Sequence, residues 1–507
     1  MSSRAVAAGP SLKDLAAATP DSRDRYVDLL RAFSIAVVVF GHWLMAIVFY
    51  DNGNVSGESA LDAIPGMWIL TWLLQVMPLF FFVGGFSNLT SIEAARRKGQ
   101  STRTFVRSRV ERLMKPTVVF ISTWLVVAFV LEQTFGLGDA LRHATALIAK
   151  PVWFLAVYLL VVALAPRMLD LHKRFRWTVP AVMVAGAIVV DITRIAFDVE
   201  LLGYLNFAFV WLFAHQLGFF YADGTLPAKS RRFFVVAAAL GLGALVALTN
   251  IGVYTRSMVG VADQYVSNND PPSICLIALT TWLVSLAMLL RGPITRWLAT
   301  PRNWAAVIAA NSMIMTVFLW HLTALLIAVV VAYPLGFPQY AGGTLGWWLT
   351  RPAWIAILCL ALVPLVYAFS RFERPRFKTG ASPAPQLPIA VTVVGIALLI
   401  IGMAGFAQGG FAGVLEPTGT DLGLFEANPL LSAFHMALGV ALLRTGSRVA
   451  VAFASAALVG VGALEAFPLA GDLLSVIPIT TGNTVLHLAC GTALSVFGRT
   501  DEARRTN

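Results

Sequence analysis

The chain is short of charge. Only 12% of its 507 residues are Asp, Glu, Lys or Arg, whereas 58% are hydrophobic. About a quarter of the residues in a soluble domain are charged, so this composition excludes an ordinary soluble fold. Apolar runs of roughly 17–25 residues recur along the whole chain, and each is long enough to cross a bilayer. We therefore predict an all-α, polytopic helical membrane protein.

Several catalytic and metal-binding signatures are also missing. The three cysteines lie singly in apolar segments, which gives neither a metal-ligand spacing nor a disulfide framework. No G-x-S-x-G, H-E-x-x-H, Walker A or H-x-x-x-x-D pattern occurs. These absences argue against a serine hydrolase, a zinc protease, a P-loop ATPase and a glycerolipid acyltransferase, and we expect no bound metal.

The net charge of +11 indicates a membrane topology rather than nucleic-acid binding. Basic residues gather in short gaps between apolar runs, whereas alternate gaps such as 51–62 and 413–426 are acidic or neutral. This is the positive-inside pattern, which places the basic gaps in the cytoplasm. The main basic gaps are 96–115, 167–176, 229–232 and 371–378. We expect a multi-pass plasma-membrane protein without a nucleic-acid partner.

The apolar runs divide into a body and a tail. We predict ten spans in residues 25–378 and four in residues 389–507, separated by a Pro-rich linker at 379–388. Residues 1–24 are rich in Ala, Ser and Pro, and we expect them to form a mobile cytoplasmic tail. An even number of spans places both termini in the cytoplasm.

The tail contains a short repeat of His-x-x-x-Gly, formed by His435 with Gly439 and by His487 with Gly491. Small residues let membrane helices approach closely, so we expect the two glycines to lie at helix contacts. Each histidine is either a polar tie between helices or part of a site, and the sequence leaves both open.

The first apolar run, "RYVDLLRAFSIAVVVFGHWL" (25–44), carries Asp28, Arg31 and His42. At 100° and 1.5 Å per residue, Arg31 and His42 point about 20° apart and lie about 16 Å apart along the axis. Asp28 falls within about 40° of His42 on the same face. A snorkelling arginine and an interhelical histidine bond are the simple alternatives, but ionisable residues at such depth mark functional sites by default.

Two further segments complete a recognisable pattern. The next span contains "MPLFFFVGGFSN" (77–88), and a basic segment carries Arg109, Arg112 and Lys115 in "RSRVERLMKP". With the Arg31–His42 spacing, and weaker matches at 152–160 and 311–321, residues 25–375 resemble the membrane-bound acyltransferase-3 family. Gly84 stands where that family usually has a serine. The tail resembles a four-helix membrane domain of unknown function, which suggests an accessory role.

The resemblance implies an acyl-CoA-dependent O-acyltransferase. It would move an acyl group, commonly acetyl, to a hydroxyl of a cell-envelope saccharide, a glycolipid or a related acceptor. The implied donor contacts are Arg31, Arg109, Arg112 and Lys115, because arginine forms bidentate bonds with phosphate. The implied catalytic residues are His42, His321 and Asp28, with His42 as a general base or a covalent acyl carrier and Asp28 orienting Arg31.

The acceptor side is less marked. The most polar external gap, 254–272, offers Asp263, Gln264, Tyr265 and Asn268 as glycan contacts, or is simply a solvated loop. A transporter or flippase is the main alternative function, although no two halves of the chain match as transporter repeats do. A non-catalytic scaffold for envelope assembly is the second alternative.

Overall fold

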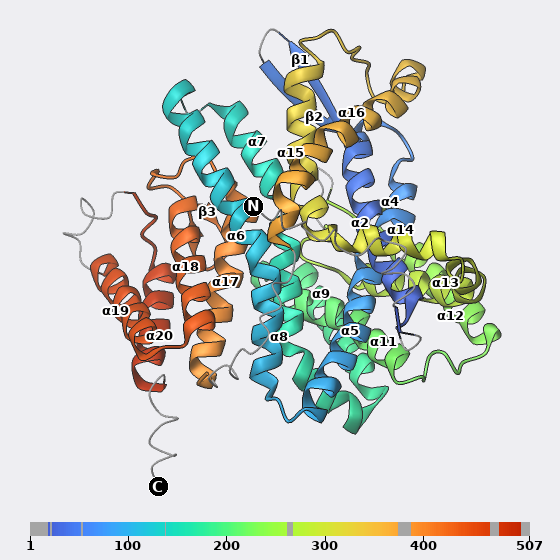
Figure 1. The fold of residues 1–507 in the computed structure, drawn as a ribbon, viewed down its shortest axis with the longest axis horizontal. Coiled ribbons are helices and arrows are strands. Elements are labelled where there is room, and N and C mark those ends of the chain that lie inside the picture. Colours follow the sequence, from blue (N-terminus) through green and yellow to red (C-terminus); the bar gives the residue numbers. More distant parts are fainter. Residues whose placement is uncertain are drawn as a thin grey trace, which may run out of the picture. The chain divides into compact units, whose positions relative to one another are not determined.

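The computed structural model describes residues 19–20, 23–51, 54–136, 138–260, 267–373, 387–466 and 476–497, and it is mainly helical (Figure 1). Most of the predicted N-terminal tail (1–24) and linker (379–388) lies outside these residues. So do Asp263, Gln264 and Tyr265 of the predicted acceptor loop. The statements below concern the described residues only.

In the described part of the chain, twelve helices are long and apolar enough to cross a membrane. This confirms an all-α polytopic membrane protein, and ten of the twelve lie in the predicted body. The body spans are Arg25–Met45, Trp68–Arg97, Thr102–Phe135, Asp139–Phe175, Thr178–Phe197, Glu200–Ala222, Arg231–Asn250, Ile274–Leu298, Ile314–Ala332 and Leu345–Phe372. The remaining two of the twelve, Ile389–Gly409 and Arg448–Glu465, lie in the tail. The tail has four helices in all, the number that we predicted.

The individual elements of the body follow. They are α2 (Arg25–Met45), β1 (Ala46–Asp51), β2 (Asn54–Ser59), α3 (Ala60–Ala63), α4 (Trp68–Leu74), α5 (Met77–Arg97), α6 (Thr102–Phe135), α7 (Asp139–Ala149), α8 (Pro151–Phe175), α9 (Thr178–Phe197), α10 (Glu200–Gly203), α11 (Asn206–Ala222), α12 (Arg231–Asn250), α13 (Ile274–Leu298), α14 (Pro301–Ser312), α15 (Ile314–Ala332), α16 (Leu345–Phe369) and the short 3₁₀ helix η1 (Ser370–Phe372).

The tail contains α17 (Ile389–Gly409), β3 (Thr420–Asp421), β4 (Glu426–Ala427), α18 (Pro429–Thr445), α19 (Arg448–Glu465) and α20 (Thr481–Phe497). Helices α18 and α20 have 17 residues each, at the short end of what spans a bilayer. The strands pair as two small sheets, β1 with β2 and β3 with β4.

Some predicted spans are broken in the structure. The run at 65–92 is interrupted after α4, and α5 restarts with Pro78 in its first turn, where the missing amide proton costs no helical bond. The run at 304–332 is interrupted at Met313 between α14 and α15. Just before that break, the Asn311 side chain bonds the carbonyl oxygen of Val307, a local alternative to helical bonding.

The chain forms two compact units. Unit 1 contains residues 1–46, 59–87 and 171–318, and unit 2 contains residues 47–58, 88–170 and 319–507. In unit 1, α12 packs on α13, α9 packs on α11, and α2 packs on α13 and α14. In unit 2, α17 packs on α18 and α19 on α20, while α6 and α7 contact the tail through α18 and α17.

Two glycines allow two helices of unit 1 to approach closely. A Cβ atom added at Gly85 would lie 1.9 Å from the carbonyl oxygen of His215, and one at Gly218 would lie 2.0 Å from that of Phe82. The backbones of α5 and α11 therefore touch at the "GGF" sequence. Only a residue without a side chain permits this contact.

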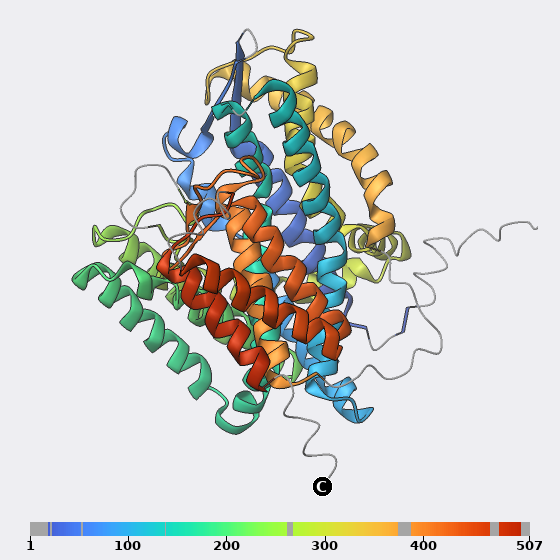
Figure 2. The same ribbon diagram turned by 90° about the vertical axis from the view of Figure 1, so that its left-hand side faces the viewer.

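The tail uses the same device, as predicted for the two repeat glycines. A Cβ at Gly439 would lie 2.7 Å from the Gly395 carbonyl oxygen on α17, and one at Gly491 would lie 2.9 Å from the Val459 amide on α19. Both glycines thus lie at helix contacts, which confirms that prediction. Figure 2 shows the red tail helices running side by side.

Candidate active site

The start of α2 holds Asp28 and Arg31 in an ion-paired cluster. Asp24 caps the helix by accepting a hydrogen bond from the Val27 amide, and the acidic Asp28 follows in the first turn. The Asp28 carboxylate is buried, at 6% exposure, and each of its oxygens has an arginine partner. Arg23 Nε lies 2.6 Å from Oδ2, and Arg31 Nη1 lies 3.1 Å from Oδ1.

Arg31 also reaches a second helix. Its Nη2 donates to the Ser87 hydroxyl on α5 at 2.7 Å, and 28% of its side chain stays exposed. Ser87 belongs to the "GGFSN" sequence, three residues after Gly84. The family resemblance pointed to position 84, where Gly84 replaces a serine. In the structure it is the hydroxyl of Ser87, three residues later, that contacts Arg31.

A second set of contacts surrounds the same end of α2. The Tyr221 hydroxyl donates to Asp24 Oδ2 at 2.8 Å, and Arg291 Nε donates to the Tyr221 oxygen at 2.9 Å. The Asn311 amide donates to the Asp28 carbonyl oxygen at 2.9 Å. These partners come from α11, α13 and α14, so four helices of unit 1 fix the cluster. Nothing local in the sequence marks them, because they lie between 70 and 283 residues from their partners.

His42 lies near the other end of α2, which stops at Met45. Its side chain is partly buried, and its carbonyl oxygen accepts the Ala46 amide that closes the helix. Asp28 precedes it by fourteen residues, or about 21 Å of helix. Asp28 therefore contacts Arg31 and is not within reach of the His42 ring, which fits an orienting role better than a direct chemical one.

His321 lies on α15 in unit 2 and is fully buried. Its neighbour Trp320 packs edge-on to Phe120 of α6, with ring centroids 5.2 Å apart. Two residues further on, the Thr323 hydroxyl accepts a bond from Trp124 Nε1 at 3.0 Å. Helix α6 thus holds α15 on both sides of His321.

The basic residues Arg109, Arg112 and Lys115 lie in the first half of α6, a 34-residue helix. Arg109 is partly buried, bonds the Ser91 hydroxyl and lies 5.7 Å from the Phe105 ring centroid. Arg112 and Lys115 are exposed. Arg112 and Lys115 thus give this part of α6 an exposed cationic surface.

Other arginines of α6 fasten the tail instead. Arg103 donates to the carbonyl oxygen of Leu387, and Arg107 donates to that of Arg444. The basic residues that indicated a cytoplasmic segment therefore differ from one another: Arg103 and Arg107 bind the tail, whereas Arg112 and Lys115 are exposed. Only the side-chain partners separate them.

The tail also packs against the helix that supports His321. Phe411, just after α17, is completely buried and stacks on Trp124 with centroids 6.3 Å apart. It also meets Phe120 edge-on at 5.9 Å. Phe120 and Trp124 are the same two rings that contact α15 beside His321. Phe411 of the tail thus packs on the two rings that hold α15 in place beside His321, a predicted catalytic residue.

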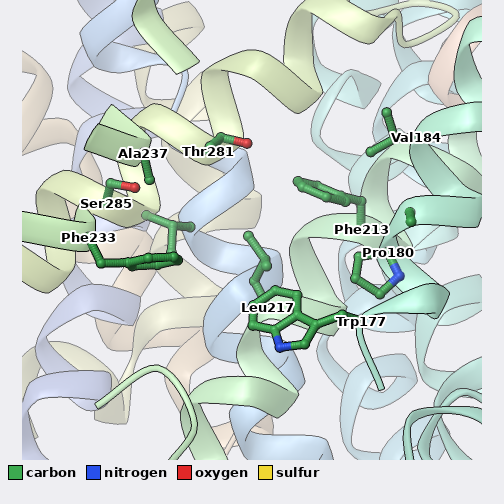
Figure 3. Close-up of a pocket in the computed structure, with 11 residues that line it drawn as sticks. Trp177, Pro180, Val184, Phe213, Leu217, Phe233, Ala237, Thr281 and Ser285 are labelled. Carbon is green, nitrogen blue, oxygen red and sulfur yellow. The ribbon is translucent and has the colours of Figure 1, made fainter. Parts of the chain in front are cut away.

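Unit 1 also contains an apolar pocket of about 290 Å³ (Figure 3). Helices α9, α11, α12 and α13 line it, with Thr281 and Ser285 supplying hydroxyl oxygens among mainly hydrocarbon side chains. None of the predicted site residues lines it. Its chemistry suits a hydrocarbon chain rather than a nucleotide or a sugar.

Comparison with known proteins settles the family. A family model described as an acyltransferase domain matches residues 24–371, which is most of the body. The chain belongs to the membrane-bound acyltransferase-3 family. A second model, a domain of unknown function (DUF4383), matches residues 389–500. No curated protein and no solved structure matches.

The acyltransferase-3 match confirms the resemblance drawn from Arg31, His42 and the later segments. It establishes a multi-pass membrane acyltransferase, which requires an acyl donor and an acceptor. It does not assign roles to individual residues, so the seven predicted site residues remain predictions.

Proposed function

We propose that this acyltransferase takes its acyl group, with acetyl preferred, from acyl-CoA on the cytoplasmic side. The acceptor is a hydroxyl of a cell-envelope saccharide, a glycolipid or a related molecule. The observation that carries the proposal is the contact of Arg31 with Asp28 and with Ser87 of α5, at the start of the helix that also holds His42. A fixed cation at one end of a membrane-length helix and an imidazole about 16 Å along it suit a donor with an anionic end and a long neutral arm.

The cluster supports Arg31 as a donor contact. Asp28 and Ser87 hold two of its guanidinium nitrogens, which fixes the side chain before a ligand arrives. A preformed cation loses less conformational entropy when it binds a phosphate or polarises a thioester. Arg109, Arg112 and Lys115 supply further phosphate contacts in this proposal, and the exposure of Arg112 and Lys115 supports it.

His42 acts on the acceptor. Its unprotonated ring nitrogen accepts the proton of the acceptor hydroxyl, and the hydroxyl oxygen attacks the thioester carbonyl carbon. A C–O bond forms, the C–S bond breaks, and the departing sulfur takes the proton from the imidazolium. In the alternative route a His42 nitrogen attacks the thioester carbon, the C–S bond breaks, and the departing thiolate takes the proton of the acylated ring. The acceptor hydroxyl then attacks the acyl carbon, a C–O bond forms, the C–N bond breaks, and the hydroxyl proton passes to the imidazole. His321 is the second candidate for either role.

The test uses the purified full chain in lipid nanodiscs with radiolabelled acetyl-CoA and an extract of envelope lipids and glycans. We expect His42→Ala to lower acyl transfer by about 10²-fold or more, because a general base contributes about 10²–10⁴-fold. His143→Ala, an exposed histidine on α7, is the matched control and should keep full activity. Transfer that persists in His42→Ala would overturn the role of His42.

The donor site has its own test. We expect Arg112→Gln to raise the KM for acyl-CoA about tenfold with kcat little changed, as loss of a phosphate contact should do. Arg232→Gln, an exposed arginine on α12, controls for loss of positive charge alone. Acyl groups missing from envelope glycans or lipids of a deletion strain, measured by mass spectrometry, would identify the acceptor. Intact acylation in that strain would exclude an envelope acceptor.

A further inference from the structure

Three ionisable side chains form a hydrogen-bonded row inside the tail. Glu465 ends α19, His487 lies on α20 and His435 lies on α18. Glu465 Oε2 is 3.0 Å from His487 Nδ1, and His487 Nε2 is 2.8 Å from His435 Nε2. The side chains of Glu465 and His487 are fully buried, and His435 is 1% exposed. The row connects three helices of the domain of unknown function.

Both ends of this row are unsatisfied. Among the described residues, neither Glu465 Oε1 nor His435 Nδ1 has a hydrogen-bond partner, and both atoms are buried. A buried polar atom without a partner is costly, so a structural tie alone would not be expected to leave one at each end. The arrangement points to a site whose occupancy changes.

The hydrogen-bond pattern defines two proton states. In the first, His487 Nδ1–H donates to the Glu465 carboxylate and His435 Nε2–H donates to His487 Nε2. The His435 Nδ1 atom is then a bare acceptor, and the row carries one negative charge. If a proton binds at His435 Nδ1, the proton on His435 Nε2 can move to His487 Nε2. This yields an imidazolium beside a carboxylate, with no net charge.

Within the described tail helices, no Lys or Arg side chain forms an ion pair with Glu465. Helix α17 has no ionisable side chain. Arg444 and Arg448 lie about 14 Å along α18 from His435 and about 26 Å along α19 from Glu465, respectively. Cys490 lies one turn from His487, and the ionisable residues of strands β3 and β4 are the acidic Asp421 and Glu426. Since a buried unpaired carboxylate is unfavourable, a bound proton is the natural counter-charge.

A metal suits the row less well. Only two imidazole nitrogens converge, while the carboxylate is bound to the far side of one ring. Among the described residues, no group of three or more His, Cys, Asp or Glu side chains has the arrangement of a metal site. Zinc sites generally take three or four protein ligands.

We propose that Glu465, His487 and His435 form a proton-binding site. It takes up one proton at His435 Nδ1 and holds it across the three side chains. This activity does not depend on acyl transfer, and it gives the domain of unknown function a definite ligand.

The test follows the histidine protons directly. The full chain, with ¹⁵N-labelled histidine, is placed in lipid nanodiscs and titrated by NMR from acid to alkaline pH. We expect two of the seven histidines to show coupling through a shared N–H···N bond and to change protonation together at one midpoint. His435→Gln should remove both features, whereas Ser455→Ala, a buried tail residue outside the row, should keep them.

Glu465→Gln tests whether the carboxylate of Glu465 stabilises the bound proton. It keeps the size and an acceptor oxygen but removes the negative charge, so we expect proton binding to weaken about tenfold or more. Independent titration of the two histidines, or binding unchanged in Glu465→Gln, would overturn the proposal. A stoichiometric metal found by elemental analysis and lost in His435→Gln would also overturn it. The coupling measurement on the unmodified chain decides the matter even where a variant fails to fold.

Discussion

Two buried carboxylates of this acyltransferase are neutralised in different ways. Asp28, at the start of α2, lies between the guanidinium groups of Arg23 and Arg31. Among the described residues, Glu465 in the tail is paired only with the imidazole of His487. An arginine is charged at every physiological pH, whereas a histidine gains or loses its charge near neutrality. The first carboxylate therefore has permanent counter-charges, whereas the counter-charge of the second depends on the protonation of a histidine.

The largest effect should come from Phe411, which joins the tail to α6 in unit 2. We expect Phe411→Ala to lower the free energy of unfolding by about 3–5 kcal/mol, because it removes a fully buried ring. Activity should also fall, because Trp124 and Phe120 support the helix that carries His321. Thermal unfolding in detergent and the acyl-transfer assay provide the two measurements.

Phe453→Ala is the matched control for that variant, since Phe453 lies on α19 of the same tail but is 66% exposed. It should change the unfolding free energy by no more than about 0.5 kcal/mol. If Phe411→Ala left both stability and activity intact, the tail would be an independent unit. A change in the protonation of Glu465, His487 and His435 would then leave the activity of the acyltransferase body unchanged.

The two carboxylates can be compared directly through Asp28→Asn and Glu465→Gln. We expect Asp28→Asn to cost about 2 kcal/mol at neutral pH, since it leaves two permanent cations without their partner, and both are partly solvated. Glu465→Gln should cost about 1 kcal/mol or less, since His487 can release its proton and keep a hydrogen bond to the amide. Chemical unfolding of both variants measures the difference.

The pH dependence sharpens the same contrast. The cost of Asp28→Asn should stay constant from about pH 6 to pH 9, because arginine does not titrate there. The cost of Glu465→Gln should vary with pH, because the proton that we propose the row to hold is lost as the pH rises. Equal and parallel pH profiles would show that the two carboxylates are held in the same way.

The smallest effect concerns Asp223, a partly exposed carboxylate just after α11. Burial alone would raise its pKa, but hydrogen bonds from Thr225, His172 and Arg176 outweigh burial and lower it. A lowered pKa in the folded state stabilises the fold above about pH 4 and is lost as the pH falls through the folded value. Because solvent screens this exposed group, we expect Asp223→Asn to cost only about 0.5 kcal/mol at pH 7 and nothing in strong acid.

Acid unfolding curves of Asp223→Asn and the unmodified chain should therefore converge at low pH. Asp170→Asn is the control, since Asp170 is 51% exposed and pairs with Arg96, so it should have little effect at any pH. If the two curves stayed separate in acid, the stability that Asp223 contributes would come from its packing and hydrogen bonds rather than from its charge.

The sequence by itself determined the membrane fold, the family and the polar stripe of α2. Span length, charge placement and helical periodicity are local properties, so they can be read without knowing which helices touch. The same holds for the small residues of the repeat, because Gly439 and Gly491 at helix contacts follow from residue size alone.

Only the tertiary structure decided which polar groups meet. Ser87 is 56 residues from Arg31, and Glu465 is 22 residues from His487, on a different helix. Phe411 reaches α6 across almost 300 residues of chain. Such contacts depend on how whole helices pack, which no local pattern encodes. The sequence placed His435 and His487 in the tail, and only helix packing brings them into a row with Glu465.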